Sequence, residues 1–331
     1  MAGRRGRGTG WIVGILIILA LAWVGYWYAA RYAADTAIAK AAARGIGCGD
    51  VAVGGFPFQL DVRCDHGAYA ANGSTAGIGG FLAHAPLYTP GAINARLESP
   101  LTINLPQRNI ALTATWTAGS ANGGAWTDGV NAASAAFTTL KIENSGNLPL
   151  ATASADSASG ALSPAGGGSY NLATSVHRLS LARQDGGAYP TLDLDLSAIA
   201  RDVGALGTDP AKAFLAWLRN APKVDINKLR VAANDAIISA SGALSLSKDG
   251  LLNGNILLRY NSIDALANLI ETLHPGTRDK YAAAFQGITA MSKPVQTEDG
   301  PALQTALTFT DGLIWLTVIP LPMQPLPAIK F

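Results

Sequence analysis

The sequence predicts an α+β fold that is mainly antiparallel β-sheet, preceded by one N-terminal transmembrane helix. Three observations lead to this prediction. An uncharged apolar run of twenty residues fills positions 11–30. Short segments of alternating apolar and polar residues, separated by turn residues, then recur along the chain, which is typical of antiparallel strands in a meander. Three segments with helical spacing interrupt them within residues 205–291.

The composition excludes several classes of protein. Hydrophobic residues make up 49% of the 331 residues and charged residues 14%, which excludes a disordered chain. Of 24 basic residues, four precede the first acidic residue, Asp35, so 20 basic and 22 acidic residues remain in the body; the four are Arg4, Arg5, Arg7 and Arg31. That balance lacks the basic surface that nucleic-acid binding requires, so we expect no nucleic-acid partner.

The apolar run predicts where the protein is located. Residues 11–30 (WIVGILIILALAWVGYWYAA) can cross about 30 Å of hydrocarbon as a helix. Arginines cluster before the run, and such clusters stay on the cytoplasmic side. We therefore expect a cytoplasmic tail at 1–10, a signal-anchor in a bacterial inner membrane at 11–30 and a periplasmic body at 31–331. Aromatic side chains crowd the far end of the run, where they favour the membrane interface: Trp23, Tyr26, Trp27, Tyr28 and Tyr32.

A cleaved signal peptide is the alternative interpretation of the same run. Ala20-Leu21-Ala22 matches an Ala-x-Ala cleavage site, and the Arg-rich start would serve as the basic region before it. Apolar residues continue past that site to Ala30, which favours retention as an anchor. Cleavage would leave a soluble periplasmic body, so both interpretations export it.

Two cysteines follow the membrane segment. A helix is expected to continue through residues 33–44 and to end at Gly45. Cys48 and Cys64 are the only cysteines, and in an oxidising compartment an isolated pair is most simply a disulfide. Closing a loop of about fifteen residues stabilises the fold by roughly 3 kcal/mol. A metal site is a weaker interpretation because His66 is the only imidazole nearby, and a thioredoxin-like site needs two residues between its cysteines.

Alternating runs predict the strands of the body. They lie at 101–105, 110–116, 192–196, 224–226, 237–246, 256–260 and 307–318. Segments rich in Gly, Ala and Ser at 119–129 and 154–169 favour loops or weak edge strands. The apolar segment 312–321, broken by Pro320, is too short to span a membrane and is expected to be a buried strand.

Three helices and one hairpin are predicted near the C-terminal end. Pro210 opens the first helix, Ser262 caps a second that stops before Pro275, and residues 278–291 form the third. Asp249-Gly250 lies between two alternating runs, which indicates a β-hairpin. The helix after Ser262 should lay its leucine face on one side of that hairpin.

The N-terminal order of features resembles a known family. A membrane helix is followed by Cys48, the motif Gly55-Phe56-Pro57-Phe58 and a strand that ends on Cys64. This order, with the Pro-rich ending after 312, resembles alphaproteobacterial envelope proteins grouped as domain of unknown function 2125. The Gly-x-Leu-x-Leu pattern that starts at Gly242 is more distantly similar to AsmA-like envelope proteins. The resemblance implies curved antiparallel sheets, some with a groove for acyl chains, and it assigns no catalytic residues.

The sequence contains no recognised catalytic, metal or cofactor signature. The four histidines (His66, His84, His177 and His274) lack ligand spacing, and there is no Gly-x-Ser-x-Gly elbow or phosphate loop. His274 is predicted to lie at the end of a helix, just before Pro275. Asp193 and Asp195 alternate with leucines, so we expect them on the solvated face of a strand and not as a catalytic pair. Body tryptophans are expected in the core more often than at a ligand: Trp116, Trp126, Trp217 and Trp315.

These observations favour a non-enzymatic envelope protein without a cofactor. Its partners would be the inner membrane, through the N-terminal helix, and a lipid or other hydrophobic ligand on the curved sheet, since apolar burial gains about 25 cal/mol per Å². A structural or scaffold protein that engages another envelope protein is the alternative. A hydrolase with an unrecognised site is a third hypothesis, which would need a polar cluster converging in a pocket.

Overall fold

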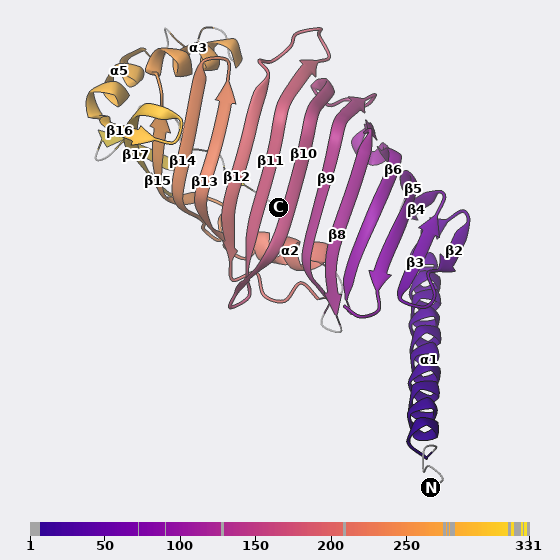
Figure 1. Ribbon diagram of the computed structural model, residues 1–331. Coiled ribbons are helices and arrows are strands. Elements are labelled where there is room, and N and C mark those ends of the chain that lie inside the picture. The colour runs from indigo at the N-terminus through magenta and orange to yellow at the C-terminus, as the bar shows by residue number, and fades with distance from the viewer. Residues whose placement is uncertain are drawn as a thin grey trace.

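The computed structural model is one continuous curved sheet with a helical stalk at one end and small helices at the other (Figure 1). It describes residues 7–71, 73–89, 91–126, 129–207, 210–273, 276, 278, 282–316, 319–320, 326 and 328–329. Helix α1 (Arg7–Ala43) ends where Gly45 adopts a positive φ of 83°. Its Cβ position would lie 2.6 Å from the Ala70 carbonyl oxygen, so glycine is required there. The predicted continuation of this helix to Gly45 is confirmed.

The strands of the N-terminal half follow each other in short hairpins. They are β1 (Ile46–Cys48), β2 (Val51–Gly54), β3 (Gln59–Cys64), β4 (Gly67–Ala71), β5 (Ser74–Pro86), β6 (Ala92–Leu105), β7 (Ile110–Thr115), β8 (Ala118–Trp126) and β9 (Gly129–Asn144). A single 3₁₀ turn, η1 (Pro106–Arg108), joins β6 to β7.

The C-terminal half continues the meander and adds helices. Its strands are β10 (Leu150–Gly166), β11 (Ser169–Arg183), β12 (Leu192–Arg201), β13 (Lys223–Ala233), β14 (Ala236–Leu246), β15 (Leu252–Tyr260), β16 (Lys293–Thr297), β17 (Gly300–Thr310), β18 (Leu313–Leu316) and β19 (Ile319–Pro320). The helices are α2 (Pro210–Leu218), α3 (Ile263–Leu273) and α5 (Ala282–Met291).

All strand pairs are antiparallel, and most join consecutive strands. Long strands hold two short ones end to end: β5 pairs β3 and β4 on one side, while β6 and β9 share β7 and β8 between them. At the far end β15 pairs with β17, and β16, which follows the helices α3 and α5 in the chain, also pairs with β17. The predicted antiparallel meander with a few packed helices is confirmed.

Local predictions near the C-terminal end are also confirmed. The turn between β14 and β15 closes with a hydrogen bond from Gly250 N–H to the Ser247 carbonyl, 3.0 Å. The Ser262 hydroxyl accepts a hydrogen bond from Ala265 N–H at 3.3 Å, as a helix cap does. Helix α3 packs on β14, and Pro210 begins α2.

Two predictions are wrong. The segments 119–129 and 154–169 contain most of β8 and β10, which have paired strands on both sides and are neither loops nor edges. The run 307–318 is not one strand, because Asp311 and Gly312 turn the chain with positive φ between β17 and β18. The third predicted helix, 278–291, is confirmed over its described residues, because residue 278 and the segment Ala282–Met291 are helical. His274, predicted at a helix end, lies outside the described residues.

Candidate functional site

The sheet has two chemically different faces. Directly paired residues of an antiparallel sheet point to the same side, and alternate residues point to opposite sides. Following the pairs from β2 to β18 therefore assigns each residue to a face. One face collects leucine, isoleucine, valine, phenylalanine and alanine, and we call it the apolar face. Representative positions, strand by strand, are Val53, Val62, Ala83, Ala95, Ala121, Ala135, Gly160, Leu172, Ala198, Ile226, Ala240, Leu258 and Leu307.

The opposite, polar face carries the ion pairs of the sheet. Asp61 contacts His84 at 2.7 Å, Lys141 contacts Glu143 at 2.6 Å, and Asp225 pairs with Arg201. Some apolar residues also occur on this face, among them Ile199 and Leu257. The distribution of charge nevertheless differs sharply between the two sides, so only one of them can offer a surface to apolar groups.

A bidentate ion pair of the polar face joins β13 to the turn between β16 and β17. Arg230 donates from Nε and Nη2 to the Asp299 carboxylate, with distances of 2.8–3.1 Å. These hydrogen bonds lower the pKa of Asp299 below its ordinary value, and partial burial opposes the effect. Lys228 reaches the neighbouring Glu298 at 2.6 Å. The turn is therefore fastened to the polar face by charge.

Helices cover the apolar face at its two ends. At the N-terminal end α1 contacts β1 and β3. At the C-terminal end α3 packs on β14 and α5 on β17, and the Tyr260 hydroxyl lies 2.7 Å from the Ser292 hydroxyl. Helix α2 lies at one end of β12, where Trp217 Nε1 donates to the Arg201 carbonyl at 2.7 Å. Buried residues accordingly occur at both ends, with Trp27 at one and Tyr260 at the other, and also near α2, where Ala198, Ala200 and Trp217 are buried.

Between the helices the apolar face is only partly covered. Residues of β6, β9 and β11 such as Leu101, Leu140 and Leu172 keep an intermediate exposure although they point to the apolar face. The stretch from β6 to β12 is roughly 24 Å wide at about 4.8 Å per strand. An acyl chain occupies about 15 Å, half the hydrocarbon core of a bilayer. The uncovered stretch is therefore large enough for acyl chains.

A hollow of about 330 Å³ opens on the apolar face beside the end of α1. Ile38 and Ala41 of the helix form one wall, and Val62, Phe81 and Leu101 of the sheet form the other. The lining is almost entirely apolar, as expected for a site that binds hydrocarbon. Its position places the N-terminal end of the apolar face next to the membrane-spanning candidate.

The motif Gly55-Phe56-Pro57-Phe58 forms the joint between α1 and the sheet. Trp23 Nε1 donates to the Pro57 carbonyl at 2.7 Å, and Trp27 Nε1 donates to the Gln59 carbonyl at 3.0 Å. Trp27 is 4% exposed and packs edge-on against Phe56 with ring centroids 5.4 Å apart. Gly55 has φ 93°, and its Cβ position would lie 2.8 Å from the Gln59 carbonyl oxygen. The motif therefore has a structural role that its sequence alone did not define.

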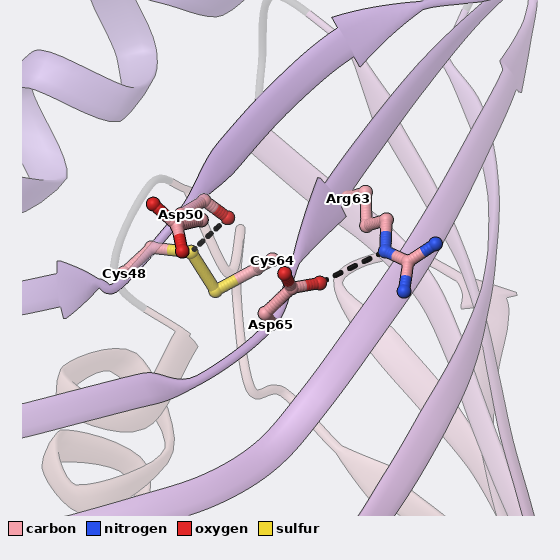
Figure 2. Close-up of a disulfide and its surroundings, with 5 residues drawn as sticks. All are labelled: Cys48, Asp50, Arg63, Cys64 and Asp65. Atoms are coloured by element: carbon pink, nitrogen blue, oxygen red, sulfur yellow. Dashed lines mark hydrogen bonds and ion pairs between the residues drawn. A yellow bond between two sulfur atoms is a disulfide. The ribbon is translucent and has the colours of Figure 1, made fainter.

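The cysteine pair closes the same end of the sheet (Figure 2). Cys48 at the end of β1 is bonded to Cys64 at the end of β3, with their Cα atoms 5.8 Å apart. Beside the bond, Arg63 donates to the Asp65 carboxylate at 2.8 Å. The predicted disulfide is thus present, and it ties the first strand after α1 to the strand that carries the joint.

The structure also places the other residues that the sequence singled out. Asp193 and Asp195 lie on the polar face, where they accept hydrogen bonds from Arg178 N–H and from the Ser175 hydroxyl, so their predicted position is confirmed. The described histidines are not brought together. Within the described part of the chain, no group of three or more His, Cys, Asp or Glu side chains has the geometry to hold a metal ion.

The body tryptophans have separate surroundings. Trp116 donates from Nε1 to the Leu97 carbonyl at 3.0 Å and packs against Phe137. Trp217, a residue of α2, is buried, and Trp315 is half-buried on β18. The side chain of Trp126 lies outside the described residues. None of these contacts places a tryptophan in a polar ligand cage.

The fold and the site define a class of protein: a single amphipathic antiparallel sheet, apolar on one face, carried by an N-terminal apolar helix. Among the described helices, α1 is long and apolar enough over Ile15–Ala43 to cross a membrane or to serve as a signal sequence. The chain belongs to a bacterial family described as "uncharacterized protein conserved in bacteria (DUF2125)", which matches residues 23–327. No curated protein and no solved structure matches the chain.

Proposed function

We propose that this protein is a membrane-anchored, non-enzymatic lipid-binding protein of the cell envelope, with its body in the periplasm. The apolar face carries the proposal, because it continues from the end of α1 across β6–β12 and keeps half-exposed residues such as Leu101, Leu140 and Leu172, although Ala198 and Ala200 near α2 are buried. The disulfide supports an oxidising compartment for the body. The arginines before residue 11 support a cytoplasmic N-terminus.

Physical chemistry favours acyl chains as the ligand. Each CH₂ group moved from water onto an apolar surface contributes about 0.8 kcal/mol, so a single long chain supplies enough free energy for stable binding. A soluble monomer rarely exposes an apolar area of this extent without a partner. The hollow at Ile38 and Phe81 would receive a chain leaving the bilayer, and the half-exposed residues beyond it would hold the chain further along the sheet.

Lipid analysis of the purified full chain tests this proposal. The protein would be expressed with its disulfide intact, extracted gently and measured by native mass spectrometry before and after organic extraction. We expect bound species of lipid mass that extraction removes. A protein that carries no lipid above the level of an unrelated single-span control would contradict the proposal. A stoichiometric protein partner with no lipid would instead favour a scaffold function for the same face.

A further inference from the structure

The joint between α1 and the sheet carries a second, separate set of exposed aromatic side chains. Phe56 and Phe58 in the turn between β2 and β3 are 54% and 64% exposed, and Tyr88 between β5 and β6 is 71% exposed. Both turns lie against the same stretch of α1, since Tyr26 Oη donates to the Leu87 carbonyl at 3.4 Å while Trp23 donates to Pro57.

The positions of these contacts along α1 show how far the two turns reach back along the apolar run. Arg31 is the first charged residue after the run, and its guanidinium lies over the Trp27 ring at 5.7 Å. Trp27 and Trp23 precede it by four and eight residues, or about 6 and 12 Å along a helix that rises 1.5 Å per residue. The turns that contact these tryptophans therefore lie on the membrane side of Arg31, at the depth where interfacial aromatic residues are found.

Both turns also lack charged residues, as a position in the membrane interface requires. No charged residue occurs in 51–60 or in 85–95. A carbonyl exposed to hydrocarbon costs several kcal/mol unless it is hydrogen-bonded. Here side chains of α1 donate to the carbonyls of Pro57, Gln59 and Leu87. The Gln59 amide donates to the Gly55 carbonyl within its own turn, and the Leu87 amide donates to the Phe58 carbonyl of the other turn.

We infer that the turn at Gly55–Phe58 and the turn at Tyr88 enter the far interface of the bilayer beside α1. The sheet would then stand directly on the membrane, with the first end of its apolar face open to the lipids. This inference rests on the proposed function in one respect, which is that α1 spans a membrane. The bilayer is the occupant that fits, because the turns continue the surface of the apolar run and are held at its outer end.

Accessibility of spin labels in the full chain, reconstituted in nanodiscs of phosphatidylcholine and phosphatidylglycerol, tests the inference. A nitroxide would be attached through an unnatural keto amino acid at position 58 or 88, leaving the disulfide untouched. Position 19 in the apolar run and position 173 on the polar face serve as controls, since Leu19 and Ala173 are both exposed. The measurement compares quenching by oxygen, which enters bilayers, with quenching by a water-soluble nickel complex.

We expect labels at 58 and 88 to favour oxygen, as at 19, and the label at 173 to favour nickel. Labels at 58 and 88 that behave like 173 while 19 favours oxygen would overturn this inference alone. Nickel access at 19 would overturn both the anchor and the inference. Low access of both reagents at 58 and 88 would show that protein covers the turns, which also contradicts the inference.

Discussion

Leu172 and Asn171 are neighbours on β11 that face opposite sides of the sheet. Leu172 pairs with Leu162 and Ala198 on the apolar face, whereas Asn171 pairs with Ser163 and Ile199 on the polar face. The two residues lie side by side on one strand. A difference in lipid binding between variants at these positions therefore depends on which face the side chain occupies and not on its place in the sheet.

A charge at position 172 should therefore weaken lipid binding. We expect Leu172→Asp to lower the amount of co-purifying lipid at least tenfold, since desolvating a carboxylate under an acyl chain costs more than about 1.4 kcal/mol. Asn171→Asp should retain the wild-type amount. Lipid content per mole of protein is the readout, with circular dichroism to check folding. Equal lipid content in the two variants would contradict the assignment of the apolar face.

The ion pair between Asp299 and Arg230 should make a pH-dependent contribution to the free energy of unfolding. The folded-state pKa of Asp299 is lowered by Arg230, so its contribution is fully present above the unfolded pKa of about 3.9 and is lost as the pH falls through the folded pKa. Asp299→Asn should lower the free energy of unfolding by about 0.5–1 kcal/mol at pH 7. The difference from the wild type should disappear in acid. Urea titrations at several pH values measure it, and a pH-independent difference would show that the ion pair is not its source.

At the scale of elements, bulges decide whether the apolar face is continuous. Val176 and Leu179 on β11 are three positions apart, yet both belong to the apolar face because the register shifts between them and Arg178 adopts φ 52°. Phe137 and Leu140 are likewise on one face, with Thr139 at φ 51° between them. Simple alternation along the sequence would have assigned these pairs to opposite faces.

This explains how much of the molecule could be predicted from sequence. The run at 192–196 alternates apolar with polar residues at every step, and the run at 237–246 does so over part of its length, so their strands were identifiable. Segments 119–126 and 154–166 consist mainly of Ala, Ser and Gly, which have little contrast and weak strand preference, and their pairing on both sides supplies the order instead. The disulfide could be predicted from two cysteines, whereas the joint required knowing which tryptophans meet the Gly-Phe-Pro-Phe turn.

Replacing Trp27 should loosen the turns that pack against α1. Trp27→Ala removes a buried indole and its hydrogen bond to Gln59, which should cost about 3 kcal/mol locally. We expect amide exchange at Gln59 and Leu87 to accelerate about a hundredfold. Tyr28→Ala is the matched control, because Tyr28 is exposed on the adjacent helix position. Similar exchange rates in the two variants would show that Trp27 does not hold the turns.

The disulfide makes a prediction for the same end of the sheet. Replacing both Cys48 and Cys64 by Ala should lower the free energy of unfolding by roughly 3 kcal/mol, as expected for opening a loop of this length. The shift of the urea midpoint measures the change, and the wild type in reducing buffer provides an independent comparison. Unchanged midpoints in both samples would mean that the bond does not constrain the unfolded chain.

At the scale of the whole molecule, one sheet separates an apolar face from a charged one over its full length. Spanning roughly 60 Å along its curve at about 4.8 Å per strand, it is too wide for the small helices to cover. Helices lie at its two ends (Figure 1), and Ala198 and Ala200 are buried near α2, whereas Leu101, Leu140 and Leu172 remain half-exposed. The stability of the fold in water and its capacity for lipid therefore depend on the same surface.

Photo-crosslinking in native membranes tests this account most directly. A benzophenone amino acid would replace Leu172 or, as the control, Asn171 in the full chain, in cells whose lipids carry a radioactive acyl label. We predict that irradiation transfers label to the protein with the probe at 172 and leaves the protein with the probe at 171 close to background. Labelling that is equal at the two positions, or absent from both, would contradict a lipid-binding apolar face.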